Sequence, residues 1–235
     1  MHTPRLLDRL DSVPDLVDRV HGALRDAIVD GALAPGARLT QEELARRLAV
    51  SRQPVLQALR LLKADGLVND APGRGLQVTP LDAASIAAVY QVREALDVLA
   101  ARLAARARAR LDPALVQAGR EALRAQSVRG LIDADAAFHD AIYRASGNPL
   151  IADSAHLHWR HIRRAMGAVL ARAALRETVW DEHAAIVDAI ADGDEARAAE
   201  LMAGHDQRAS DFITGMLGRA ADAHPPFPTP HGDTP

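Results

Sequence analysis

The sequence contains no cysteine, so it can form neither a disulfide bond nor a thiolate metal site. Any metal ion must therefore bind to His, Asp, Glu or water. The chain also lacks a run of about 18 apolar residues, the length that predicts a membrane-spanning helix. Its first ten residues lack the apolar stretch of a signal peptide. These absences predict a soluble protein of the reducing cytoplasm that has no membrane partner.

The chain also has little excess charge of either sign. Its formal net charge is -3 over 235 residues, which argues against a protein that coats nucleic acid indiscriminately. The charge is uneven, however, because residues 37–80 contain seven Lys or Arg and four Asp or Glu. This length and a hydrophobic content of 49% allow two domains. The asymmetry is typical of a DNA-binding module joined to a domain with a different partner.

Helix signals follow one another closely in the first 64 residues. Residues 1–13 show no periodicity and are expected to form a flexible arm. From Asp15 onward, apolar residues every four positions predict a helix that ends near Gly31. Thr40, with Glu43 three residues later, is a capping-box pattern that starts a second helix at Gln41. Ser51 is the expected N-cap of a third helix, whose first turn tolerates a proline.

The third helix carries Arg52, Gln53, Leu56 and Gln57 on its outward face. Two helices joined by a tight turn, with Arg and Gln near the start of the second, form the arrangement that reads base edges in the major groove. Two short strands, residues 67–68 and 76–78, then flank a glycine-rich turn. They predict a wing whose tip residue, Arg74, reaches phosphate or the minor groove. Residues 14–80 are thus expected to be a winged helix-turn-helix domain.

Several spaced motifs in this domain resemble those of the GntR family of transcription regulators. They are G-x-L-x-P-G-x-x-L from Gly31, E-x-L-A from Glu42, V-S-R-x-P-V from Val50, A-L-x-x-L from Ala58, G-L-V from Gly66 and G-R-G-x-x-V from Gly73. The resemblance implies that the Arg of the P-G-x-R-L turn, the Arg after Ser51 and the wing Gly and Arg contact DNA. The predicted DNA-binding residues are therefore Arg38, Thr40, Arg52, Gln53, Leu56, Gln57, Arg74 and Gly75.

One position departs from the pattern of that family. The family usually has P-V-R, where this chain has Pro54-Val55-Leu56. An apolar side chain replaces a guanidinium that is expected to reach a base, so the base preference of the family does not carry over. The alternative interpretation of the domain is a winged-helix module that binds a protein.

Residues 81–218 contain repeated helix signals and no strand signal, and they predict an antiparallel bundle of six to seven helices. The six helices that can be placed start at Asp82, Asp112-Pro113, Leu131, Asn148-Pro149, Leu175 and Asp194. The proline-rich residues 219–235 predict a disordered tail. The expected fold class is mainly α, with an N-terminal winged helix-turn-helix and a C-terminal all-helical domain.

Ionisable side chains occupy the apolar stripes of three of these helices. Asp135 and His139 lie four apart in one, while His183 and His205 lie in two others. Buried groups of this kind are costly unless they are paired or ligated, and residues four apart share a helix face, as two ligands of one ion must. Each histidine alone is more simply a hydrogen-bonded core residue. The four together predict a divalent metal site that suits Zn, and also Ni or Mn.

The same region resembles the C-terminal ligand-binding (FCD) domain of the FadR-type branch of the GntR family. The resemblance rests on D-x-x-F-H from Asp135, a following G-N at Gly147, and E-H-x-x-I-x-x-A-I-x-x-G-D from Glu182, with His205 after it. It implies that the Asp and the three His bind a divalent metal and that a small carboxylic acid completes the site.

Arg93 lies in the apolar stripe of the first helix of this domain, where a guanidinium needs an anionic partner. That partner is either the carboxylate of an effector or Asp97, four residues later, and the sequence leaves both open. Asn148 is the second candidate for effector binding, although it also suits a helix cap.

These features predict a regulator without enzymatic activity that changes its DNA affinity when a small organic acid binds. Two recognition helices need two half-sites, so a homodimer on a palindromic operator is expected. The alternative is a metal-dependent hydrolase with an appended winged-helix module, although the chain has no H-E-x-x-H motif and no evident inward-facing general base. A third hypothesis is a constitutive DNA-binding scaffold with a metal-free bundle.

Overall fold

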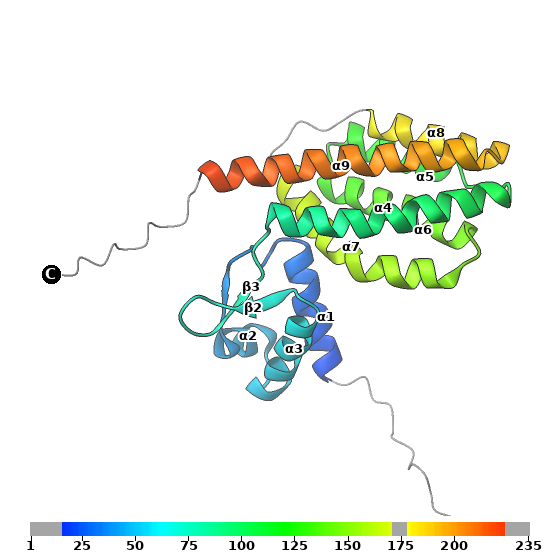
Figure 1. Cartoon of the computed structure of the whole chain (residues 1–235). Coiled ribbons are helices and arrows are strands. Elements are labelled where there is room, and N and C mark those ends of the chain that lie inside the picture. The colour runs from blue at the N-terminus through cyan, green and yellow to red at the C-terminus, as the bar shows by residue number, and fades with distance from the viewer. Residues whose placement is uncertain (1–15, 171–177, 224–235) are drawn as a thin grey trace, which may run out of the picture. The chain divides into compact units, whose positions relative to one another are not determined.

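The computed structural model describes residues 16–170 and 178–223 of the chain. The chain forms two compact units, and the division between them falls between Pro80 and Leu81. The first unit has a small sheet and a core of its own, and the second is a bundle of helices (Figure 1).

The N-terminal unit contains three helices and three short strands within its described residues. They are α1 (Leu16–Val29), β1 (Arg38–Leu39), α2 (Gln41–Leu48), α3 (Arg52–Ala64), β2 (Val68–Asp70) and β3 (Leu76–Val78). The apolar stripe of α1 packs against α3, so that Leu24 and Ile28 share one core with Val55 and Leu59. Burial of these side chains stabilises the packing of α1 on α3.

The turn between α2 and α3 has the geometry of a helix-turn-helix. Thr40 Oγ1 accepts a hydrogen bond from the backbone N–H of Glu43 at 3.3 Å, so the predicted cap of α2 is present. Ala49 ends α2 in the left-handed conformation, with φ 53°. Ser51 occupies the predicted N-cap of α3, but its side chain makes no capping hydrogen bond. The predicted N-cap position of Ser51 is therefore confirmed.

The wing is an antiparallel hairpin of β2 and β3, and β1 pairs with the other edge of β3 to give the strand order β1-β3-β2. The hairpin turn is closed by a hydrogen bond from the N–H of Ala71 to the C=O of Gly75 at 2.9 Å. Gly73 and Gly75 have φ of 88° and 100°, a region that favours glycine. The sequence did not predict β1, because a strand of two residues carries no alternating pattern.

The C-terminal unit contains six helices and no strand in the residues that are described, as predicted. They are α4 (Ala83–Arg106), α5 (Ala114–Arg124), α6 (Val128–Ala145), α7 (Pro149–Leu170), α8 (Val179–Asp192) and α9 (Glu195–Ala223). Local side-chain caps start at least four of them, α4 and α9 among these. Asp82 accepts from the N–H of Ser85 at 2.7 Å, and Asp194 accepts from the N–H of Arg197 at 3.0 Å.

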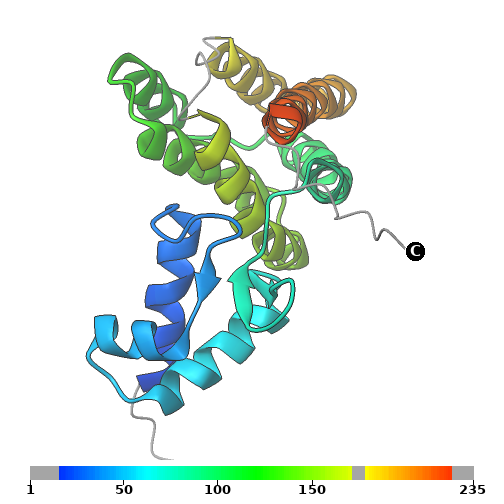
Figure 2. The same ribbon diagram turned by 90° about the vertical axis from the view of Figure 1, so that its left-hand side faces the viewer.

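The two longest of these helices, α4 and α9, lie side by side (Figure 1). Figure 2 views them nearly end-on, with the other four helices of the unit on one side of the pair. Phe138, Ile142, Ile162, Ile186 and Met202 are fully buried between the helices. This packed interior is where the functional side chains of the bundle lie.

Gly119 of α5 allows the ring of Trp180 of α8 to pack directly on the helix backbone. A Cβ atom added at Gly119 would lie only 2.0 Å from Trp180 Cζ2. Any larger residue there would therefore move the ring or separate the two helices.

Two predicted boundaries of the helical domain are wrong. Helix α6, the third helix predicted for this domain, begins at Val128 rather than Leu131, because Ser127 Oγ accepts from the N–H of Gly130 and caps the helix. Helix α9 continues to Ala223, so the tail predicted from residue 219 starts too early; residues 219–223 contain good helix formers that extend the last helix. The predicted helix start at Leu175, the arm of residues 1–13 and the tail from residue 224 lie outside the described residues.

The architecture confirms the predicted fold class, a mainly helical chain with a winged helix-turn-helix followed by a helical bundle. None of the helices within residues 16–170 and 178–223 is long and apolar enough to cross a membrane.

Candidate functional site

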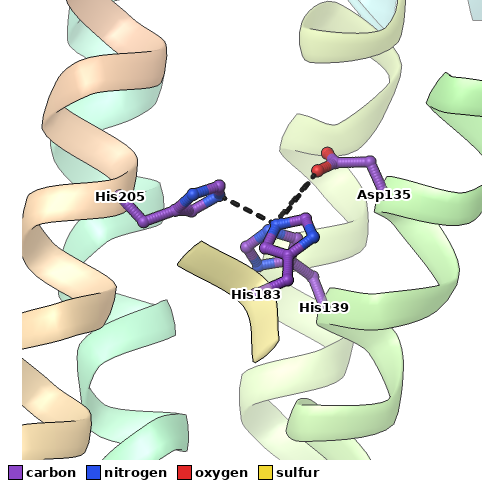
Figure 3. Close-up of side chains that lie close together, drawn as sticks. All are labelled: Asp135, His139, His183 and His205. Atoms are coloured by element: carbon purple, nitrogen blue, oxygen red, sulfur yellow. Dashed lines mark hydrogen bonds and ion pairs between the residues drawn. The ribbon is translucent and has the colours of Figure 1, made fainter. Parts of the chain in front are cut away.

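Three helices bring the four predicted metal ligands together. Asp135 and His139 lie one turn apart on α6, His183 lies on α8 and His205 on α9, and all four side chains are buried. One ligand atom of each residue lies within 4.8 Å of those of the other three. Figure 3 shows the four side chains converging from these helices.

The ligand atoms are spaced as the ligands of a single ion require. His183 Nε2 lies 3.3 Å from His205 Nε2 and 3.5 Å from Asp135 Oδ1, and His139 Nε2 lies 3.9 Å from the same oxygen. Four ligands at zinc distances of about 2.0–2.1 Å in a tetrahedron are roughly 3.4 Å apart. A donor set of three imidazoles and one carboxylate at these spacings fits a divalent ion.

A carboxylate lies beside the far nitrogen atom of each of two imidazoles, and the contact at His205 has hydrogen-bond geometry. Asp97 Oδ2 lies 2.9 Å from His139 Nδ1, and Glu182 Oε2 lies 2.9 Å from His205 Nδ1. The hydroxyl of Tyr143 in turn donates a hydrogen bond to Asp97. A proton on each Nδ1 leaves the lone pair of Nε2 for the cluster, which is how carboxylates orient metal-binding histidines.

His183 is positioned by aromatic rings. The Phe138 ring stacks on it with centroids 3.9 Å apart, and the Trp180 ring meets it edge-on at 4.7 Å. Its Nδ1 has no hydrogen-bond partner among the described residues. Burial lowers the pKa of His183 well below its ordinary value, and the neighbouring His205 and His139 lower it further. The ring is therefore neutral at neutral pH, the state that binds a metal.

The guanidinium of Arg93 lies in the same cluster. Its Nε donates to Asp97 Oδ2 at 3.0 Å, and its Nη2 donates to His139 Nε2 at 2.7 Å. Nε also lies 3.5 Å from Asp206 Oδ1, and the guanidinium carbon lies 4.5 Å from the centre of the Trp159 ring. Burial alone would lower the pKa of Arg93, but Asp97 and Asp206 outweigh it and raise that pKa. The ion pair with Asp97, one of the two predicted partners, is present.

The sequence interpretation missed Asp206, whose only signal is that it follows His205. Its side chain is buried on α9, and neither oxygen accepts a hydrogen bond from the described residues. Burial and the nearby Asp97 raise the pKa of Asp206 well above its ordinary value. For Asp97 burial also acts upward, but His139 and Arg93 outweigh it and hold the pKa of Asp97 low. The pKa values of the two carboxyls beside Arg93 are thus shifted in opposite directions.

A cavity of about 80 Å³ opens beside the cluster, several times the volume of about 10–15 Å³ that admits one water molecule. Its polar lining residues are Tyr90, Arg93, Asp135 and His205. Of the two residues predicted to bind an effector, only Arg93 lines this cavity. Asn148 Oδ1 instead accepts from the N–H of Leu150 at 3.1 Å and caps α7.

In the N-terminal unit, the side chains predicted to read DNA lie on one face of α3. Arg52, Gln53 and Gln57 are exposed, and Leu56 is half-buried. Arg52 Nη2 lies 3.4 Å from Glu42 Oε2 of α2, and both side chains are largely exposed. Such a pair contributes little to stability, so Arg52 can exchange it for a contact with DNA.

Arg38 has a structural role that the sequence did not indicate. Its Nη2 donates to the C=O of Pro72 at 2.8 Å and its Nη1 to the C=O of Arg74 at 3.4 Å. These bonds tie β1 to the wing turn, where Arg74 and Gly75 are exposed. Thr40, by contrast, uses its hydroxyl to cap α2.

The winged helix-turn-helix and the helical bundle together define a transcription regulator of two domains. The family described as bacterial regulatory proteins, gntR family, matches residues 16–78, and the FCD domain family matches residues 88–208. The chain belongs to the GntR family of DNA-binding transcription regulators and carries an FCD domain, so the predicted family is confirmed.

Similar proteins cover both domains. A protein of Streptomyces ambofaciens, named as an HTH-type transcriptional regulator in an unstable DNA locus, is 34% identical over 195 residues, 81% of each chain. The transcriptional regulator LutR of Bacillus subtilis is 30% identical over 222 residues, 81% of this chain and 97% of LutR. These names indicate transcription regulators rather than enzymes.

Solved structures show the same architecture. A GntR transcriptional regulator from Rhodococcus sp. RHA1 is 26% identical, with a TM-score of 0.71 over 85% of this chain and 97% of that one. McbR/YncC of E. coli has a TM-score of 0.71 over 88% of this chain and all of the other at 21% identity, which shows the fold alone.

Proposed function

We propose that this regulator holds a divalent metal ion on Asp135, His139, His183 and His205 and senses a small carboxylic acid beside that ion. The observation that carries the proposal is the buried cluster of four ligand atoms from three helices. The four ligand atoms converge on one buried point, and one ion could bind all of them together. Zinc is the first candidate, with nickel and manganese as alternatives.

The metal would supply a Lewis-acid centre with an open position for an oxygen ligand. Arg93 supports a carboxylate as that ligand, because its guanidinium lines the cavity together with Asp135 and His205 and offers parallel N–H donors. These three residues belong to α4, α6 and α9. An acid bound among them would favour one arrangement of the three helices, which is how a ligand shifts a conformational equilibrium.

For DNA, we propose that α3 enters the major groove and that the wing contacts the backbone. Arg52, Gln53 and Gln57 offer hydrogen-bonding groups to bases or phosphates, and Leu56 offers an apolar contact such as a thymine methyl group. Arg74 would meet phosphate or the minor groove. Because Leu56 is half-buried at the position where the family usually has Arg, the base preference should be specific to this chain.

We propose further that the protein is a homodimer on a palindromic operator, since paired half-sites require paired recognition helices. Helices α4 and α7 pack against each other, and each exposes two large apolar side chains two turns apart. These are Val92 and Leu99 on α4, and Leu150 and Leu157 on α7. Exposed apolar stripes of this kind suit an interface. Light scattering should show a dimer that Leu99→Arg with Leu157→Arg weakens, and a monomeric native protein would contradict the proposal.

The metal is tested by elemental analysis of the purified full-length protein beside a His139→Ala, His183→Ala double variant. The native protein should hold close to one ion per chain and the variant much less. Equal metal content in the two would remove the metal from the proposal.

DNA reading is tested with sequences selected from a random pool, at several salt concentrations. Arg52→Ala and Arg74→Ala should each weaken binding and reduce its dependence on salt. Unchanged affinity and salt dependence in both variants would show that neither side chain contacts DNA.

The hydrolase alternative gains no support from the site. Among the described residues, Glu182 is the glutamate that contacts the cluster. It is bound to His205 Nδ1 at 2.9 Å and to Arg208 Nε at 2.8 Å. Burial acts to raise its pKa, but these two hydrogen bonds outweigh burial and lower it, which suits an orienting group better than a general base at neutral pH. Turnover that tracks metal loading would revive this alternative.

A further inference from the structure

The cavity beside the cluster is polar at one end only. Arg93 Nη2 lies 3.9 Å from Asp135 Oδ2, and the ligand atoms of Asp135 and His205 lie within 4.8 Å of each other. Tyr90 belongs to the same end, because the guanidinium carbon of Arg93 lies 5.5 Å from the centre of its ring. The groups that can bind an acid are therefore gathered in one place.

The rest of the described lining is hydrocarbon or aromatic. It includes Leu123 of α5, Leu131 of α6, Met166 of α7, Trp180 of α8, and Phe212 and Ile213 of α9. Among the described residues that line the cavity there is no Lys, no second Arg, and no Ser, Thr, Asn or Gln. Apart from the indole N–H of Trp180, a polar substituent on the far part of a ligand would therefore meet no hydrogen-bonding side chain among the described residues of this wall.

We infer that the sensed acid is a monocarboxylate with an apolar aliphatic or aromatic body, rather than a dicarboxylate. This inference rests on the proposed acid-binding function. A second carboxylate against the apolar wall would lose its hydration without gaining a partner. Each methylene group buried against the same wall should instead tighten binding about fourfold until the cavity is filled.

Matched pairs of acids test the inference with the zinc-loaded full-length protein in calorimetric titrations. Butanoate and succinate differ in whether the chain ends in a methyl group or a carboxylate, and so do hexanoate and adipate. Butanoate should bind more tightly than acetate by about fourfold for each added methylene, and hexanoate should bind at least tenfold more tightly than adipate. Metal content measured after each titration ensures that chelation does not account for the difference.

Variants of Met166 locate the effect in the cavity wall. Met166→Gln keeps the length of the side chain but adds an amide, and it should reduce the ratio of hexanoate affinity to acetate affinity. Met166→Leu is the apolar control and should keep the preference. Circular dichroism of both variants verifies that the bundle is folded.

The outcomes separate this inference from the proposed function. If succinate and adipate bind as tightly as the monoacids or more tightly, the apolar-acid inference is overturned while acid sensing stands. If none of the acids binds, including acetate, the acid-sensing function itself fails. If hexanol binds as tightly as hexanoate, the carboxylate has no role and both statements fail.

Discussion

Replacing Arg93 with Met should strengthen metal binding while weakening acid binding. Arg93 Nη2 donates to His139 Nε2 at 2.7 Å, and that nitrogen has a single lone pair, which it can give either to Arg93 or to a metal ion. Methionine keeps an apolar stem beside Trp159 and removes the donor. A residue that only supported the fold would instead weaken both ligands when it is replaced.

The magnitude follows from the contacts of the guanidinium. A hydrogen bond to a charged group contributes about 1.5–3 kcal/mol. Removing the bond from Arg93, which competes with the metal ion for His139 Nε2, should therefore lower the metal Kd roughly ten- to a hundredfold. The same change leaves Asp97 buried without its cation, and breaking a buried pair costs about 3–5 kcal/mol. A bound ion would offset part of that cost, so zinc should raise the melting temperature more in the variant than in the native protein.

The assay is a competition titration of metal-free protein against a zinc chelator of known affinity, followed by titration with butanoate. Arg93→Lys is the matched control, because an ammonium group keeps the charge but loses the planar fork; it should keep near-native metal affinity and bind acid more weakly. Arg106→Met, at an exposed ion pair with Glu195, should change neither affinity. A folded Arg93→Met variant whose metal Kd is unchanged or higher would refute the competition.

Three further predictions concern single positions. The folded-state pKa of His183 lies below the unfolded value of about 6.5, so the unfolded chain takes up the proton first as the pH falls. The melting temperature of the metal-free protein, measured with a chelator present, should therefore decrease between about pH 7.5 and about pH 5.5. The melting temperature of His183→Gln in the same buffer should decrease less over that range. A parallel pH dependence in both proteins would count against a neutral buried ring. Gly119→Ala places a Cβ atom against the Trp180 ring and should lower the free energy of unfolding by about 1–3 kcal/mol. Chemical denaturation should show a smaller loss when the same change is made in a Trp180→Ala background. Arg38→Gln removes two bonds to the wing turn and should weaken DNA binding roughly tenfold while speeding hydrogen exchange of the wing amides; native exchange rates there would show that Arg38 does not hold the wing.

The sequence predicted best those features whose partners lie a few residues apart. The caps by Thr40 and Asp82 bond three residues onward, so spacing alone locates α2 and α4. Asp135 and His139 share a helix face for the same reason. That His183 and His205 face the same point was inferred from apolar stripes, and the packing of α6, α8 and α9 brings their ligand atoms together.

Features that depend on which helices pack together could not be predicted in the same way. Asp206 of α9 lies beside Arg93 of α4 only because those two helices are neighbours. The apolar stripe of a helix does not indicate which other helix packs against it. Arg38 bonds to carbonyl groups more than 30 residues away, and β1 exists only through its pairing with β3. Helix α9 continues past Gly218, a residue type that often ends helices, so its end could not be read from the sequence.

A metal ion bound at the cluster would also contribute to the stability of the helical bundle. Its ligands join points 44 and 22 residues apart, at His139, His183 and His205, so an ion held there would act as a cross-link in a chain that has no cysteine to form one. A covalent link across a few tens of residues stabilises by about 3–4 kcal/mol in the chain-entropy description. A metal cross-link is reversible, and its contribution follows the concentration of free ion. The rigidity of the bundle would therefore vary with metal supply, without any change in covalent structure.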